Sequence, residues 1–223
     1  MCGRYTLTAP AEVLTEIFDL AETVELHPRY NIAPTQETAV VGLNHDGKRS
    51  LGLMRWGLIP HWAKDPSIGN RLINARAETA AEKPAFRSSF SKRRCLVPAD
   101  GFYEWQKTGG RKQPFYLQLK EHRPFAFAGL WARWKASEDE TVQSFTLLTT
   151  TPNEVAAKVH DRMPVILPPE SYDRWLDPEL HDREALEALL LPYPAEAMEA
   201  YPVSTLVNSP QNDDPRCIEP IDA

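Results

Sequence analysis

The chain has 223 residues, a hydrophobic fraction of 42% and a formal net charge of −6, which suits one large domain or two small ones. Its longest apolar runs fall short of the roughly 18 residues that a membrane-spanning helix needs, and its start has no signal-peptide pattern. The negative charge argues against indiscriminate nucleic-acid binding. We therefore expect a cytoplasmic protein that does not bind membranes.

Cysteine and histidine spacing gives no sign of a metal centre. The three Cys lie far apart, at positions 2, 95 and 217, and suit neither a disulfide framework nor a zinc site. The six His form no His-x-x-His or His-x-x-x-His pair. Glycine-rich phosphate loops are also missing from the sequence. We expect no metal and no cofactor.

The first half of the chain predicts short elements, in keeping with 20 Pro against 10 Gly. A capping hydroxyl and an early Pro predict a helix over residues 8–18, and residues 29–34 read as a loop entering a strand. A turn at residues 44–47 joins strands at 38–43 and 51–59. A loop at 60–66, a mixed stretch at 72–79 and a helix at 83–90 follow.

The second half is richer in strands. Residues 95–105 predict one strand bent at Pro98 and Gly101, and residues 107–111 predict a hairpin turn. The remaining elements are strands at 114–119, 125–131, 145–150 and 201–203, and helices at 151–159, 170–176 and 182–190. Hairpin-linked strands predominate, so we expect an α+β fold. Its single domain, residues 1–223, would be a curved, mainly antiparallel sheet or barrel flanked by helices.

Charge is distributed unevenly along the chain. Residues 71–94 contain seven basic and two acidic side chains, a local charge of +5, whereas residues from 166 to the end carry thirteen acids against three bases. Segregation of this kind can build a basic surface on an acidic protein. Scattered charges on a solvated loop explain the same pattern equally well.

Cys2 follows the initiator Met, and its small side chain favours removal of that Met. The exposed residue would then carry an α-amine with a pKa of about 7.7–8 and a thiol with a pKa of about 8.5. Such a residue can act as a thiolate nucleophile. It can also condense with an aldehyde, the amine giving an imine and the thiol closing it to a thiazolidine. The alternative is a frayed chain end without function.

Four polar side chains stand in unexpected contexts. Asn74 lies between Ile73 and Ala75, and Glu104 lies among aromatic residues. The other two, His160 and Arg162, fall between an expected helix and an expected strand. An inward-facing carboxylate needs polar partners, whereas Glu104 could equally point to solvent and His160 could be a structural residue.

Six motifs, in order from residue 1 to about residue 168, together resemble the SRAP family (SOS-response-associated peptidase, or abasic-site processing proteins). They are Met1-Cys2-Gly3-Arg4-Tyr5, Arg29-Tyr30-Asn31-Ile32-Ala33-Pro34, Trp56-Gly57, Ile73-Asn74-Ala75-Arg76-Ala77-Glu78-Thr79, Pro98-Ala99-Asp100-Gly101-Phe102-Tyr103-Glu104-Trp105 and His160-Asp161-Arg162-Met163-Pro164. The resemblance implies a monomeric sensor of abasic sites in single-stranded DNA, acting in the DNA damage or SOS response. It also implies autocatalytic or aminopeptidase removal of Met1, with possible lyase and peptidase activities, and association with the nucleoid when bound to DNA.

The resemblance also assigns roles to individual residues. Cys2 matches the residue that forms a thiazolidine crosslink with the ring-opened sugar. The matches to the other active-site positions are Asn74, Glu104 and His160, and those to DNA-contacting positions are Arg4, Arg76, Thr149 and Arg162. His160 would open the closed sugar as a general acid–base, Glu104 would manage the proton of the Cys2 amine, and Trp62 would stack on a base.

Two other functions remain open at this point. Glutamine amidotransferases with an N-terminal nucleophile also begin Met-Cys-Gly, but continue differently from Arg4-Tyr5. A non-covalent reader of single-stranded DNA would use the arginines and aromatic residues and leave Cys2 unexplained. One departure from the family concerns the loop at residues 60–63, which has a single Trp where relatives have two adjacent ones.

Overall fold

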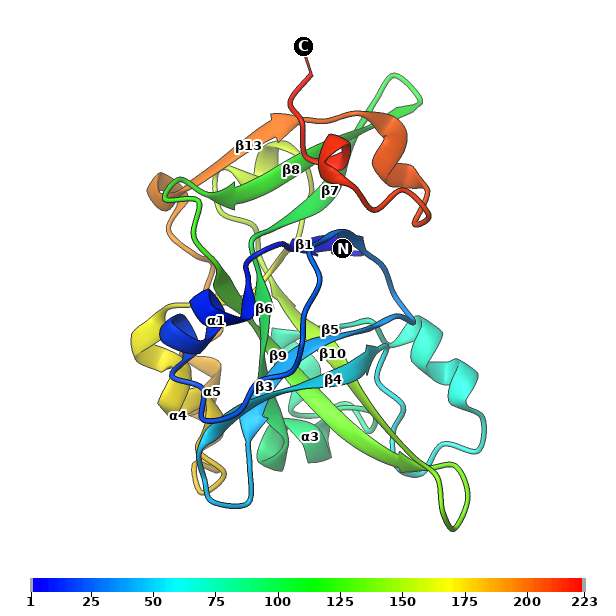
Figure 1. Ribbon diagram of the computed structural model, residues 1–223, viewed down its shortest axis with the longest axis vertical. Helices are drawn as coiled ribbons and strands as arrows, with labels where there is room; N and C mark the ends of the chain where they lie inside the picture. Colours follow the sequence, from blue (N-terminus) through cyan, green and yellow to red (C-terminus); the bar gives the residue numbers. More distant parts are fainter. Residues whose placement is uncertain (1, 222–223) are drawn as a thin grey trace.

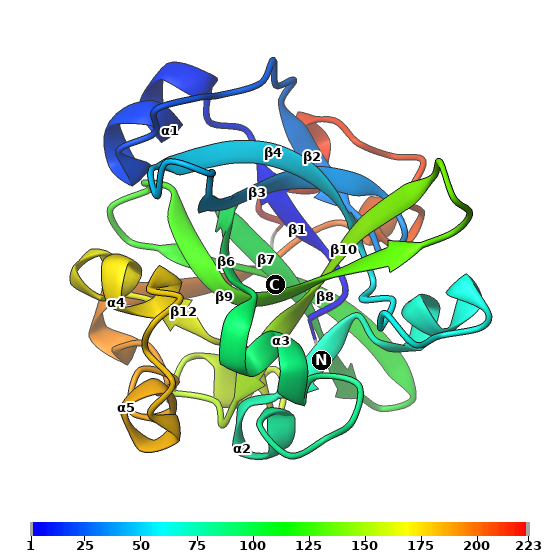
Figure 2. The ribbon, with the colours of Figure 1, turned by 90° about the horizontal axis from the view of Figure 1, so that it is seen from below.

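The fold is built around a five-stranded barrel, and the computed structural model describes residues 2–221. Neighbouring strands pair around the ring, and β10 pairs with both β9 and β4, which closes it (Figures 1 and 2). All these pairings are antiparallel except that of β10 with β4. In order around the barrel, the strands are β10 (Thr141–Thr150), β4 (Arg49–Trp56), β3 (Glu37–Leu43), β6 (Arg94–Ala99) and β9 (Phe125–Lys135).

A second, five-stranded antiparallel sheet lies above the barrel in Figure 1. Its order is β13 (Met198–Pro202), β8 (Arg111–Leu119), β7 (Gly101–Thr108), β1 (Tyr5–Leu7) and β2 (Arg29–Ile32).

The chain passes from the barrel to this sheet at Asp100, between β6 and β7. The prediction of one bent strand over residues 95–105 is therefore wrong, because its two halves pair in different sheets. Gly101 is required at the crossing, since a Cβ there would lie 2.3 Å from the ring of Tyr116.

Short helices and strands surround the two sheets. The helices are α1 (Ala11–Phe18), α2 (Ala77–Ala80), α3 (Arg87–Lys92), α4 (Tyr172–Leu176) and α5 (Arg183–Glu187), and the remaining strands are β5 (Asn74–Arg76), β11 (Met163–Pro164) and β12 (Ile166–Leu167). The predicted α+β class, with a curved, mainly antiparallel sheet or barrel flanked by helices, is confirmed.

The helix expected over residues 151–159 does not form. The chain makes a turn followed by the 3-10 helix η2 (Ala156–Lys158). Asn153 caps the start of this turn, because its Oδ1 accepts hydrogen bonds from the backbone N–H groups of Val155 and Ala156 at 3.1 and 2.9 Å. The turn is not extended into a helix because the chain soon enters β11, where Met163 and Pro164 pair with β10. His160 and Arg162 consequently lie on irregular backbone directly after η2.

The hydrophobic core is divided into two parts. The main cluster fills the barrel and includes Trp56, Phe127 and Cys2, and a smaller cluster lies under the end of the chain and includes Tyr103 and Cys217. Alternate residues of a strand face opposite sides of a sheet. Because Tyr103 faces the smaller cluster, its neighbour Glu104 faces the same side as Phe102, toward the main core.

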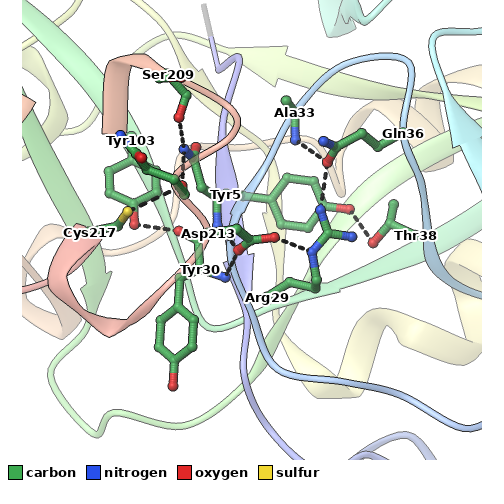
Figure 3. A network of polar contacts seen from close by, with 12 residues as sticks. Tyr5, Arg29, Tyr30, Ala33, Gln36, Thr38, Tyr103, Ser209, Asp213 and Cys217 are labelled. Atoms are coloured by element: carbon green, nitrogen blue, oxygen red, sulfur yellow. Dashed lines mark hydrogen bonds and ion pairs between the residues drawn. The ribbon is translucent and has the colours of Figure 1, made fainter. Parts of the chain in front are cut away.

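The C-terminal segment, residues 205–217, is fastened to β2 by a polar network of Arg29, Asn31 and Asp213, which we call the latch. Figure 3 shows Arg29 and Asp213 within it. The Asn31 amide donates to the carbonyls of Val207, Ser209 and Asn212 at 2.7–3.1 Å. Asp213 accepts from the backbone N–H groups of Tyr30 and Asn31 at 2.5 and 2.8 Å, and from Arg29 Nε. In Figure 1 the segment, in red, lies beside the start of the chain.

Candidate active site

Cys2 is fully buried, with an exposed fraction of 0%, and belongs to the main core. Its Sγ contacts the carbonyl oxygen of Arg4 at 3.6 Å. Burial, and secondarily the charge of Glu104, raise the pKa of the thiol far above its ordinary value. The Cys2 side chain is therefore a neutral thiol at neutral pH, which disfavours its action as a preformed thiolate. Met1 lies outside the described residues.

Asn74, the first residue of β5, holds the backbone of Cys2 in place. Its Nδ2 donates to the carbonyl oxygen of Cys2 at 2.7 Å. Its Oδ1 is buried and has no hydrogen-bond partner among the described residues. A buried amide oxygen without a partner costs free energy, and this one can accept a hydrogen bond from a ligand that enters beside Cys2.

Glu104 is only 3% exposed and lies in β7. Burial raises the pKa of its carboxyl group, and His160 is among the nearby groups that oppose this shift. A carboxyl group whose pKa is raised toward neutrality can both accept and return a proton. Its strand runs beside the start of the chain, because the backbone N–H of Tyr103 donates to the carbonyl oxygen of Arg4 at 3.0 Å, and its charge helps to raise the pKa of the Cys2 thiol.

His160 lies at the edge of the site, with its side chain 27% exposed. Its Nδ1 accepts a hydrogen bond from the backbone N–H of Arg162 at 3.1 Å and lies 3.0 Å from a carboxylate oxygen of Asp161. A ring nitrogen cannot accept from the first and donate to the second at once. The imidazole thus has two competing arrangements, which differ in whether Nδ1 carries a proton.

Arg162 is held by protein groups in this structure. Its guanidinium makes a two-pronged ion pair with Glu78 at 2.6 and 2.8 Å, and it also donates to the carbonyl of Thr149 at 2.6 Å. The Arg162 side chain is 15% exposed and the Glu78 side chain 47%. Glu78 is a residue whose role sequence reasoning missed, although it lies in the motif that contains Asn74 and Arg76.

Thr149 supports the same corner from β10. It is buried, and it stands opposite Arg76 of β5 and Pro164 of β11 in the strand register. Its hydroxyl donates weakly to the Ala75 carbonyl, at 3.4 Å. Thr149 therefore holds the strand that presents Arg76, and its own hydroxyl group contacts other groups of the protein.

A groove of about 620 Å³, the Trp62 groove, begins at Asn74. Trp62 itself is 50% exposed, and Arg76 and Lys83 bring positive charge to the lining. Phe86 adds an aromatic wall. An exposed indole beside two cations suits a polyanion with stacking bases. Lys83 and Phe86 were not among the predicted contact residues.

Not all of the basic residues between positions 71 and 94 reach the surface. Arg94 is buried and donates to five backbone carbonyls, those of Phe90, Ser91, Trp175, Asp177 and Leu180. It is a structural residue that ties α3 and α4 to the barrel. The exposed members are Arg71, Arg76, Lys83, Arg87 and Lys92. The local excess of charge thus reaches solvent only in part.

Arg4 connects the start of the chain with its end. One of its terminal nitrogens donates to the Gly3 carbonyl at 3.1 Å, and the other contacts the Asn208 carbonyl at 3.5 Å. The Asn208 side chain also accepts from Trp105 Nε1 at 2.7 Å. Asn208 was not expected to take part in the site, because nothing in its local sequence points to a partner so far away in the chain.

The structure brings four of the sequence-predicted residues together, namely Cys2, Asn74, Glu104 and His160. They come from the segment before β1, from β5, from β7 and from the turn after η2, where the barrel meets the second sheet. Among residues 2–221, no group of three His, Cys, Asp or Glu side chains could hold a metal ion. Within the same residues, no helix is both long and apolar enough to span a bilayer.

Comparison with known proteins relates the whole chain to one group. Abasic site processing protein YoqW of Bacillus subtilis (strain 168) is 47% identical over 223 residues, covering 98% of this chain and 99% of that protein. Abasic site processing protein HMCES of Xenopus tropicalis is 35% identical over 224 residues, covering 87% of this chain and 66% of that protein.

Among solved structures, one from Bacteroides thetaiotaomicron superposes with a TM-score of 0.89 at 28% identity, covering 99% of this chain and 100% of that one. A phage-related protein from Bordetella bronchiseptica superposes with a TM-score of 0.72 at 31% identity, covering 91% and 94%. The family model described as SOS response associated peptidase (SRAP) matches residues 1–210. The chain belongs to the SRAP family.

Proposed function

We propose that this protein processes abasic sites in single-stranded DNA by forming a covalent thiazolidine through Cys2 once Met1 has been removed. The observation that carries the proposal is the complete burial of Cys2 beside Glu104, with its backbone held by Asn74. A residue so close to a chain end is ordinarily frayed. Its ordered position inside the fold supports a chemical role. The relatives named as abasic site processing proteins support the same reading.

The reaction suits a neutral thiol. The free amine of Cys2 adds to the C1′ aldehyde of the opened sugar, and loss of one water gives an imine. Sγ then adds to the imine carbon while the thiol proton passes to the ring nitrogen, so the overall change is condensation without oxidation. An amine-first order needs no thiolate at the outset, in agreement with the raised pKa of the thiol.

Glu104 and His160 divide the proton transfers in this proposal. Glu104 accepts a proton from the Cys2 ammonium and returns one when water leaves, a cycle that its raised pKa favours. His160, at the open edge of the site, opens the closed sugar. The unpartnered Oδ1 of Asn74 accepts a hydrogen bond from a sugar hydroxyl or from the formed ring.

The Trp62 groove would receive the strand next to the lesion. Arg76 and Lys83 neutralise phosphates there, and Trp62 stacks on a base. Arg4 and Arg162 both contact protein groups, so a phosphate would be bound beside these existing contacts. We propose that Arg162 contacts a phosphate while it remains paired with Glu78.

Incubation with single-stranded DNA that contains uracil, after treatment with uracil glycosylase, tests the proposal. We expect a band that survives denaturation and an intact mass one Met lower for the reactive protein. Efficient crosslinking by protein that retains Met1 would exclude a thiazolidine, because an acylated nitrogen cannot form the imine. Glutamine hydrolysis without an adduct would instead indicate an amidotransferase, and tight binding without an adduct a non-covalent reader.

A further inference from the structure

A second hollow of about 410 Å³ adjoins the candidate active site at His160. We call it the Lys107 groove. Lys107 and Lys158 bring positive charge to it, and Trp105 contributes an aromatic ring. It shares no lining residue with the Trp62 groove, which meets the site at Asn74. The two hollows therefore adjoin the site at different residues, one at His160 and the other at Asn74.

The charge of the Lys107 groove favours an anion, although the protein as a whole carries a net charge of −6. Both lysines are exposed and bring their charges to one hollow. The acid in the lining is Asp161. Two cations against one acid make this hollow locally positive.

Trp105 contributes an aromatic ring to the groove, but its N–H group is not available as a hydrogen-bond donor to a ligand. Indole has one polar hydrogen, on Nε1, and here it is donated to Asn208 at 2.7 Å. A ligand in the groove would meet the ring itself, and a ring suits a stacking base. The opposite wall is fixed as well, because Gln106 Nε2 donates to the Lys158 carbonyl at 2.7 Å and so ties β7 to η2.

A polynucleotide with a lesion in its interior must leave the site in two directions. One groove of cations and an aromatic ring begins at Asn74, and another begins at His160. We propose that the Lys107 groove binds the single strand on one side of the abasic site, while the Trp62 groove binds the strand on the other side. This inference rests on the proposed function and extends it from the lesion to its flanks.

Three fluorescent oligonucleotides distinguish binding of the strand on one side of the lesion from binding of the strand on the other side. Each carries a tetrahydrofuran analogue of the abasic site, which lacks an aldehyde, placed in the middle, at the 5′ end or at the 3′ end. The variant Lys107→Ala/Lys158→Ala should weaken binding of the oligonucleotide with the central lesion and of only one of the two oligonucleotides with a terminal lesion. If both lysines contact phosphates, its salt slope should fall by about 1.4, since one phosphate contact is worth about 0.7 on single strands.

Two comparisons make the experiment decisive. Trp62→Ala should weaken binding of the oligonucleotide whose lesion lies at the other end. The control variant Lys48→Ala/Lys120→Ala replaces two exposed lysines that line neither groove, and it should bind all three oligonucleotides like the wild type. The inference is overturned when the Lys107→Ala/Lys158→Ala variant behaves like this control, or when it and Trp62→Ala weaken binding of the same terminal-lesion oligonucleotide. Crosslinking to aldehyde DNA is scored separately, so its failure would remove the thiazolidine proposal while the flank assignment is still measured.

Discussion

The latch and the site around Cys2 are made of the same residue types, each combining an Asn, an acid and an Arg. In the latch, Asp213 accepts three hydrogen bonds and the Asn31 amide reaches three carbonyls. In the site, burial disfavours the charge of Glu104, and the Asn74 amide donates to one carbonyl, that of Cys2. The Oδ1 atoms of Asn31 and Asn74 are both without a partner among the described residues, so the contrast lies in the two acids. Asp213 is stabilised as an acceptor by three donors, whereas burial of Glu104 shifts its pKa in the way that is common for proton-transfer groups.

The largest expected effect follows removal of the proposed nucleophile. Cys2→Ala should abolish the denaturation-resistant adduct, since neither sulfur nor an alternative ring closure remains, and should retain non-covalent affinity for the strand. Cys217→Ala is the matched control, because it removes a thiol that is also fully buried but lies under the C-terminal segment. Gel analysis should show full crosslinking for the control. An adduct of normal yield from Cys2→Ala would locate the reaction elsewhere.

Glu104→Gln tests the comparison between Glu104 of the site and Asp213 of the latch by changing the acid of the site. It keeps the shape of the side chain and removes its proton acceptor, so crosslinking should slow by roughly 10²–10⁴-fold. The same variant should unfold at a higher temperature at neutral pH. A raised pKa means that the folded state binds a proton more tightly than the unfolded state, so stability falls as pH rises from the ordinary value of 4.5 through the folded pKa.

The gain in stability from Glu104→Gln should therefore be present at pH 7 and disappear below about pH 4, where both states are protonated. Asp213→Asn should do the reverse at neutral pH, lowering the free energy of unfolding by about 1–3 kcal/mol through its lost charge-assisted bonds. Thermal unfolding by circular dichroism measures both. Equal destabilisation by the two variants would erase the distinction drawn between the latch and the site.

His160→Ala should have an intermediate effect that depends on the substrate. If His160 opens the sugar, the variant should crosslink closed-ring abasic DNA about 10²-fold more slowly, as the loss of one general acid–base predicts. An analogue that already presents an aldehyde should react at close to the wild-type rate. Single-turnover rates on the two substrates give the ratio directly. An equal slowing on both would make His160 a group that positions the chain or the DNA.

The smallest effect should come from Arg76. Arg76→Ala removes an exposed cation of the Trp62 groove and should lower the salt slope of single-strand binding by about 0.7 without changing the unfolding temperature. Arg162→Ala also breaks the ion pair with Glu78, so it should lower the unfolding temperature too. Adding Glu78→Ala to Arg162→Ala should restore part of the lost affinity, because it removes the acid left uncompensated. An unchanged slope in both arginine variants would make them structural residues.

Local patterns were sufficient for much of the fold. Alternation and turn residues predicted the strands that became β3, β8, β9 and β10, because each is a β-rich run bounded by turns. They could not show that Asp100 separates two sheets. Pro98 and Gly101 signal a bend, but which sheet each half joins depends on pairing with strands far away in sequence.

The site was less accessible to local reasoning. Glu104 and Asn74 stood out only as polar residues in apolar contexts, and the family motifs were needed to place them beside Cys2. Burial could not be read from residue type, since Arg94 and Arg76 look alike in sequence while one is enclosed by carbonyls and the other faces a groove. The pair formed by Glu78 and Arg162 joins residues 84 positions apart, and its geometry exists only in the folded chain.

The latch also has a consequence for protein synthesis. Asn208 is translated 204 residues after Arg4, whose side chain it contacts, and Asp213 is translated 182 residues after Asn31. Contacts between such distant parts of a chain form late in folding. A nascent chain would thus carry an exposed but unassembled Cys2, and the proposed reactive centre would become competent only after translation had delivered the residues that close the fold around it.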